Sequence, residues 1–345
     1  MITLVTFRKT VVVTLGLFLL LLVVMAFSLS FGAARLPAGE VIGVMLRVLE
    51  AFSRDRPEPA EAVILFIRLP RILLASLVGA SLAVAGAAFQ ALTRNPLADP
   101  FILGVSSGAA FGVVIAQTLG LGRVLPGYLG LPLSAFLGAI VAALAVYLIA
   151  RVDGAFPIQT LLLAGVSISL FFSASITLFI SLMSGQELPG ILHWLMGSLG
   201  PIDYSSLTLL LGCLLLAMGA IYRQARSLNL LVLGEEVAMQ LGMEGERVKR
   251  LVFVMASLLT GVAVAFSGSI GFVGLIVPHI ARILFGPDNR LLIPAAALVG
   301  ASFLVTADAM ARIIVSPAEV PVGVITAFCG APFFIYLLRK QQRSP

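Results

Sequence analysis

Ten apolar runs, most of them long enough to cross a membrane, divide this chain of 345 residues. A spanning helix needs about 20 largely apolar residues, and in lipid only helices and closed barrels satisfy their own backbone polar groups. Only 11% of the residues are charged, against roughly 25% in soluble domains. We therefore predict an all-α polytopic membrane protein, a single domain over residues 1–345. The predicted spans are 10–31, 62–92, 101–119, 131–150, 161–182, 206–221, 251–266, 273–285, 291–314 and 322–338.

The basic residues indicate the orientation of these spans. Ten is an even number, so both termini lie on one side, and both are basic, with Arg8 and Lys9 at the start and Arg339 and Lys340 at the end. Lys and Arg accumulate on the cytoplasmic side of membrane proteins, so we predict that both termini are cytoplasmic. The net charge of +6 is scattered between the spans without a basic patch, which argues against nucleic-acid binding.

One charged segment, residues 227–250, has helical periodicity of its own. Its apolar residues recur at spacings of one, three and four, and glycines punctuate it, which predicts a short helix, a turn and a second short helix. By this pattern alone the segment is either a docking element or a solvated loop that joins two spans. The apolar residues are Leu230, Leu231, Leu233, Val237 and Leu241, and the glycines are Gly234, Gly242 and Gly245.

Seven groups of motifs, in matching order over nearly the whole chain, resemble the FecCD-type permeases. These are the membrane subunits of ABC importers for iron-siderophores, haem and vitamin B12. The motifs are Arg68-Leu-Pro-Arg71; Gln90 with Arg94-Asn-Pro-Leu-Ala-Asp-Pro100; Leu103-Gly-Val-Ser-Ser-Gly108; Leu233-Gly-Glu-Glu with Leu241-Gly242; Gly271-Phe-Val-Gly-Leu-Ile-Val-Pro-His-Ile-Ala-Arg282; Ala307-Asp308 with Arg312; and Glu319-Val-Pro-Val-Gly323 with Gly330-Ala-Pro-Phe-Phe334.

The resemblance implies a type II ABC importer permease in the bacterial inner membrane. It implies a homodimer of ten-helix subunits, two cytoplasmic ATPase subunits and a periplasmic binding protein that delivers a bulky metal chelate. Iron chelates, including haem, rank slightly ahead of cobalamin in this expectation. The sequence has no GxxxxGK[ST] phosphate loop, so we expect no enzyme activity and no cofactor on this chain, with ATP and Mg bound by the partner ATPase.

The resemblance also carries site residues onto this sequence. It makes residues 228–242 the ATPase-coupling region, with Leu231 and Leu233 as buried anchor and Glu235 and Glu236 as rim charges. The assigned coupling residues are Leu228, Leu231, Leu233, Gly234, Glu235, Glu236, Leu241 and Gly242. The binding-protein docking residues are Arg68, Arg71 and Arg312; for Arg68 and Arg71, snorkelling to lipid headgroups is the alternative. Candidates for a cytoplasmic gate are Asn95 and Leu97, with Gln159 and Thr160 as weaker ones.

Two other readings remain open at this stage. Asp308 lies inside an apolar span, four residues before Arg312, so an internal ion pair is favoured over a proton relay. A proton relay would belong to a proton-coupled secondary transporter. An intramembrane hydrolase would use Ser106 or Ser107 with His279 as base, although His279 is better explained by a hydrogen bond in helix packing. His193, in the short outer segment 188–199, is a candidate for transient contact with a haem iron; no resident metal site is predicted.

Overall fold

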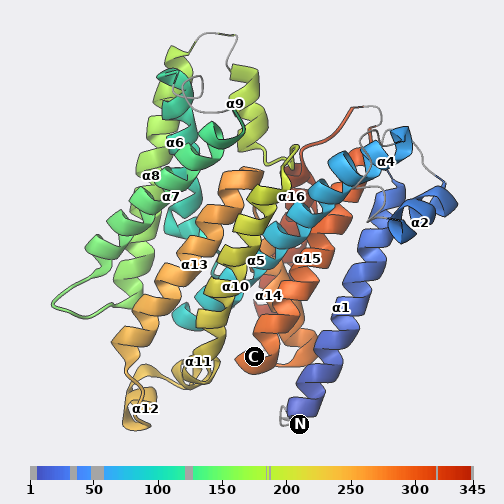
Figure 1. Ribbon diagram of the computed structural model, residues 1–345. Coiled ribbons are helices and arrows are strands. Elements are labelled where there is room, and N and C mark those ends of the chain that lie inside the picture. Colours follow the sequence, from blue (N-terminus) through green and yellow to red (C-terminus); the bar gives the residue numbers. More distant parts are fainter. Residues whose placement is uncertain are drawn as a thin grey trace.

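A computed structural model describes residues 6–31, 37–47, 58–120, 127–183, 185, 188–315 and 318–342, and each predicted span lies on a helix (Figure 1). The all-α prediction is confirmed. The spans correspond to α1 (Phe7–Ser30), the continuous α4 (Pro59–Val63), η1 (Ile64–Arg68) and α5 (Leu69–Thr93), α6 (Val105–Thr118), α7 (Gly127–Ala150), α8 (Ile158–Leu182), α10 (Tyr204–Arg223), α13 (Gly245–Ser267), α14 (Val273–Phe285), α15 (Asn289–Ile313) and α16 (Val322–Gln342).

Short helices connect these long ones at the two ends of the bundle. Helix α2 (Ala38–Leu46) and helix α9 (Leu188–Leu195) lie at one end, and α11 (Ala225–Val232) and α12 (Glu235–Gln240) at the other, together with the first turn of α1 (Figure 1). The 3₁₀ helix η2 (Pro100–Leu103) precedes α6. Within the described ranges, seven helices are long and apolar enough to cross a membrane, and α6, α14 and the apolar part of α16 (Val322–Leu337) are shorter.

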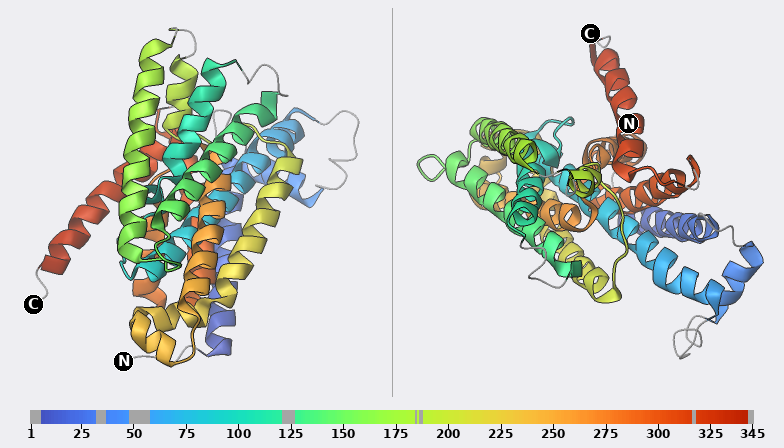
Figure 2. Two further views of the ribbon diagram at one scale, coloured as in Figure 1. Left: turned by 90° about the vertical axis from the view of Figure 1, so that its left-hand side faces the viewer. Right: turned by 90° about the horizontal axis from the view of Figure 1, so that it is seen from above.

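Helix α5 is the centre of the bundle. In its most apolar stretch 89% of the residues are buried, whereas the corresponding figure for α1 is 6%. Figure 2 shows α5 leading into the middle of the bundle, while α1 lies at its edge. Helix α5 packs against α15, α13, α14 and α10. Its sequence suits this position because small residues let helix backbones approach closely in lipid.

Glycine pairs set the two closest approaches of α5. A Cβ added to Gly79 would overlap the backbone carbonyl of Gly300 in α15, and one added to Gly86 would overlap the carbonyl of Gly274 in α14. In each case the obstacle is backbone, which cannot rotate away as a side chain can. These positions therefore fix the distances between α5 and its neighbours.

The substitution Gly86→Ala should destabilise the protein by about 1–3 kcal/mol, because the added methyl group has to push α14 away. The measurement is the unfolding midpoint of the purified chain in detergent. Gly212→Ala in α10 is the matched control: its Cβ would meet no atom within 4 Å, so this change should be neutral or slightly stabilising. Equal effects of the two substitutions would contradict the packing argument.

Candidate functional sites at the two ends of the bundle

The segment 227–250 folds as the sequence predicts, with two short helices joined by a turn. Helix α11 ends at Val232, and Gly234 (φ +122°) turns the chain into α12. Gly242 (φ +84°) then turns it towards α13. Both φ values lie in a region that strongly favours glycine, so these residues determine the shape of the connection.

The apolar residues of this segment divide into two sets. Leu228 and Leu231 are 0% and 1% exposed and pack into the protein's own core, whereas Leu233 and Leu241 are 65% and 61% exposed. The expected pairing of Leu231 with Leu233 as a surface anchor is thus corrected, because Leu231 has no free surface. The exposed ridge consists of Val232, Leu233, Val237, Met239 and Leu241.

A buried lysine holds α12 in place. Lys249, in α13, has a side chain only 2% exposed, and its Nζ lies 2.7 Å from Glu235 Oε1 and 2.5 Å from Glu246 Oε1. It also donates a hydrogen bond of 3.1 Å to the carbonyl of Phe156. Glu235 is therefore part of an internal ion pair that ties α12 to α13, which corrects its expected role as a rim charge. Glu236, by contrast, is exposed on the surface of α12.

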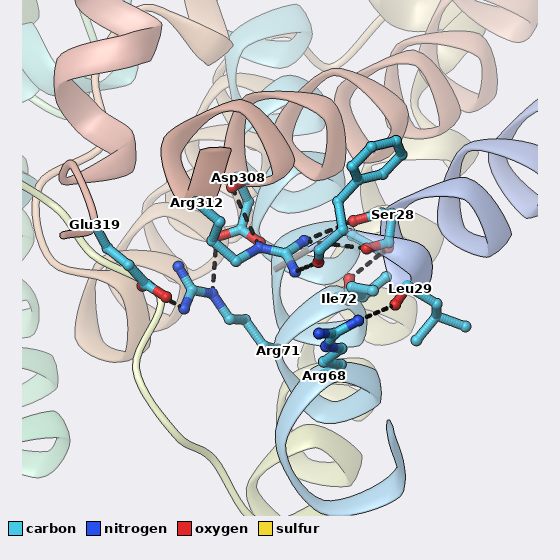
Figure 3. Close-up of polar contacts among 10 residues, drawn as sticks. Ser28, Leu29, Arg68, Arg71, Ile72, Asp308, Arg312 and Glu319 are labelled. Atoms are coloured by element: carbon cyan, nitrogen blue, oxygen red, sulfur yellow. Dashed lines mark hydrogen bonds and ion pairs between the residues drawn. The ribbon is translucent and has the colours of Figure 1, made fainter. Parts of the chain in front are cut away.

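At the other end of the bundle, Asp308 lies between two arginines (Figure 3). Its side chain is 0% exposed, and its carboxylate oxygens lie 3.0 Å from Arg312 Nε and 2.9 Å from Arg71 Nε. The predicted pair of Asp308 and Arg312 is confirmed. Sequence analysis missed the third member, Arg71, and missed Glu319, whose Oε2 lies 2.7 Å from a terminal nitrogen of Arg71.

Arg68 and Arg312 hold the end of α1 (Figure 3). Arg68 donates to the carbonyl of Leu29 at 2.6 Å, and Arg312 donates to the carbonyl of Phe31 at 2.6 Å and to Ser28 Oγ at 2.7 Å. The last carbonyls of a helix lack partners within the helix and carry partial negative charge, so guanidinium groups stabilise them.

This arrangement alters the expectation that the three arginines act as one docking surface. Arg68 and Arg312 are each 5% exposed, and this burial excludes snorkelling to lipid headgroups for Arg68. Arg68 ends the π-helical turn η1 and faces α1, while Arg71 in α5 faces α15. Only Arg71, with 18% of its side chain exposed, reaches the protein surface, beside Glu319 at 44%.

The gate candidates lie in irregular structure at the end of α5. Helix α5 stops at Thr93, Arg94 adopts a left-handed conformation (φ +51°), and Asn95 Oδ1 accepts a hydrogen bond of 2.9 Å from the Leu97 N–H. Asn95 is exposed and Leu97 half-buried; in the first turn of α8, Gln159 is exposed and Thr160 half-buried. Their role in gating stays a prediction.

The same connection contains a buried acid. Asp99 precedes η2 and accepts a hydrogen bond of 2.9 Å from the Phe101 N–H. Burial raises the pKa of the Asp99 carboxyl from 3.8 to about 6, and this hydrogen bond opposes the rise only in part. Below about pH 6 the folded protein therefore keeps a proton here that the unfolded chain releases near pH 4.

The free energy of unfolding should fall by about 3 kcal/mol between pH 4 and pH 6 through this group, because the folded state binds the extra proton in that range. Asp99→Asn should remove this contribution and leave the variant relatively more stable at pH 7. Unfolding in mixed micelles at pH 4.5 and pH 7 measures the difference. Asp153→Asn, at an exposed turn, is the control; an unchanged pH profile in Asp99→Asn would show that Asp99 is not responsible.

The remaining candidates are distributed over separate helices. Ser106 Oγ lies 3.2 Å from Ser269 Oγ, and Ser107 Oγ donates to the Gly104 carbonyl at 3.0 Å. The His279 ring packs edge-on against Phe333, with ring centres 6.2 Å apart. Both serines thus have partners other than His279, and nothing in this geometry supports a hydrolase. His193 is exposed on α9.

Comparison with known proteins gives one consistent result. The model of the FecCD transport family matches residues 20–340. The cobalamin import system permease protein BtuC of Halobacterium salinarum is 47% identical over 83% of this chain and 76% of its own length. The hemin transport system permease protein HmuU of Yersinia pestis is 39% identical over 96% of both chains.

A solved structure shows the same fold. An inward-facing conformation of a metal-chelate type ABC transporter superimposes with a TM-score of 0.79 at 35% identity, covering 96% of this chain and 99% of the other. Fold, motifs and relatives together define an integral membrane permease of an ABC transporter. The chain belongs to the FecCD transport family.

Proposed function

We propose that this chain is the translocation subunit of an importer that carries a metal chelate, with cobalamin and haem as the two candidates, from periplasm to cytoplasm. ATP hydrolysis takes place on separate ATPase subunits. The proposal rests chiefly on the α11–α12 pair, which presents an exposed apolar ridge while its other face is fixed to the core. The FecCD relatives named for cobalamin and hemin transport support the substrate class.

The α11–α12 pair has the properties of a docking element for the ATPase. Its apolar ridge is exposed, and the pair is held to the bundle by Leu228, Leu231 and the ion pairs of Lys249. Amphipathic helices dock in this way, with apolar anchors set in a groove of the partner. Force from a closing ATPase would reach the spans because the element is attached at several points.

Replacing Leu233 and Leu241 by aspartate should abolish copurification of the ATPase, because charged groups would replace the apolar anchors. Leu119→Asp, at a residue that is also 65% exposed but lies elsewhere, should leave the complex intact. The measurement is the yield of ATPase retained on the tagged permease. Full retention in the Leu233→Asp/Leu241→Asp variant would refute this docking surface.

The homodimer is supported by a second apolar surface. Helix α16 extends away from the rest of the bundle (Figure 2) and exposes Phe328 by 76%, Tyr336 by 59% and Ile335 by 55%. Adjacent to it, a cavity of about 640 Å³ lies between α16, the end of α9 and the connection that precedes α14. We place the dimer contact and the outer part of the substrate path here.

Arg71 is the best-placed residue for a carboxylate of the binding protein. Its guanidinium already holds Asp308 on one side, and on the other it holds Glu319, which is 44% exposed and can move away. Arginine binds carboxylates through two parallel hydrogen bonds, so an acid of the binding protein can replace Glu319.

Opposite effects on docking should follow from changing the two residues of this pair. Glu319→Gln removes the competing carboxylate and should tighten docking of the binding protein, whereas Arg71→Gln should weaken it severalfold. Affinity for the binding protein in nanodiscs is the measurement, and Arg47→Gln on the exposed end of α2 is the control. If Glu319→Gln weakens docking as much as Arg71→Gln does, the pair acts as a structural unit. The proposed replacement of Glu319 by a carboxylate of the binding protein is then wrong.

The substrate is tested by reconstitution. The permease, its ATPase and its binding protein should show ATPase activity and uptake in liposomes with one of cobalamin, haem or a ferric siderophore. Stimulation by cobalamin or haem supports the proposal. Stimulation by the siderophore alone would show that the proposed substrate is wrong and that the transported chelate is a siderophore. A proton-coupled transporter would instead take up substrate without ATP, driven by a pH gradient.

A further inference from the structure

An apolar groove of about 780 Å³ runs between α1 and α10. One wall is the face of α1 from Thr10 to Leu21, and the other is the face of α10 from Leu211 to Tyr222. The floor is formed by residues of α5 and α15, among them the small residues Ala80 and Ala297. Because α1 packs mainly on α15, the space between α1 and α10 remains open.

The length of the groove corresponds to one leaflet of a bilayer. Each wall covers eleven residue steps, which is about 16 Å in a helix. That is about half of the 30 Å hydrocarbon core of a membrane. The lining is almost entirely hydrocarbon, so an acyl chain that runs from the glycerol level to the bilayer centre matches the groove in both length and chemistry.

Basic residues gather where the groove ends, on the side of the bundle that carries α11 and α12. Arg290 precedes the groove residue Pro294 by four positions and so lies on the same face of α15, one turn further out. Tyr222, at the end of α10, lines the groove on its other wall. Arg290 also pairs with Asp288 at 2.6 Å, yet 41% of its side chain is exposed.

Two further helices contribute positive charge at this level. Arg8 and Lys9 directly precede the groove residue Thr10 in the first turn of α1, and Arg223 directly follows Tyr222 at the end of α10. The mouth of the groove is therefore flanked by basic residues of α1, α10 and α15. Such a cluster attracts anionic lipid headgroups.

We propose that this groove binds one acyl chain of an anionic phospholipid, whose phosphate lies beside Arg290 and the first turn of α1. The bound lipid would fill the space that α1 leaves open and so tie this peripheral helix to the bundle. The site is separate from the ATPase ridge and from the outer Asp308 cluster, and it does not depend on which chelate is transported.

The first test measures retained lipid by native mass spectrometry of the full chain in detergent. Ala297→Phe fills the floor of the groove and should abolish the preferential retention of phosphatidylglycerol over phosphatidylcholine. Leu209→Phe is the control, since Leu209 is 59% exposed on the same α10 but does not line the groove. Equal retention of the two lipids by the unaltered chain would overturn the proposal.

A second measurement keeps the floor intact and decides the matter if Ala297→Phe does not fold. Leu215, on the groove wall and 61% exposed, is replaced by tryptophan in a Trp194→Phe background, with Leu209→Trp as the control. Phosphatidylglycerol with brominated acyl chains should quench Leu215→Trp with an affinity about fivefold higher than brominated phosphatidylcholine.

Adding Arg290→Gln should remove this difference between the two lipids, and Leu209→Trp should show none. If Leu215→Trp and Leu209→Trp are quenched alike by both lipids, the groove is ordinary lipid-facing surface and the proposal is wrong.

Discussion

Close backbone contact between α5 and its neighbours is the constraint on which the bundle depends. In lipid, apolar helices gain little from excluding hydrocarbon, so their association rests on packing. Gly79 and Gly86 allow α5 to touch α15 and α14 backbone to backbone, and the other helices are arranged around this centre. Helix α1, whose Gly16 meets no atom within 4 Å, packs on α15 without such a close approach and is also attached through polar groups at one end.

Polar side chains within the bundle attach elements that packing alone holds weakly. Arg68 and Arg312 satisfy the last carbonyls of α1, and Asp308 neutralises Arg312 together with Arg71. At the opposite end of the bundle, Lys249 attaches α12 to α13 through its ion pair with Glu235. A buried charge is tolerated because it is paired, and removing one partner leaves the other charge uncompensated at a cost of about 3–5 kcal/mol. These residues therefore stabilise the fold of the chain itself, in addition to any role in an interface.

Much of this architecture follows from the sequence, because spans and short amphipathic helices leave local patterns. The apolar runs predict the helices, the glycines of 234–242 predict the turns, and the four-residue spacing predicts the pair of Asp308 with Arg312. The rest depends on residues far apart in the chain. The partners of Arg68 and Arg312 in α1 are 39 and about 280 residues away. Leu231 and Leu233 are equally apolar, so only tertiary packing decides which of them is buried.

The tie between Lys249 and Glu235 has a mechanical consequence. Helix α13 continues from Lys249 to Ser267, and the whole helix is about 35 Å long, so α12 sits on the end of a rigid rod that crosses the bundle. At the far end of this rod the Ser267 carbonyl accepts a hydrogen bond of 2.9 Å from Ser198, and the neighbouring Gly197 carbonyl accepts one of 3.2 Å from Gly323 at the start of α16. Lys249, α13 and these two hydrogen bonds therefore form a continuous connection from α12 to the loop after α9 and the first turn of α16.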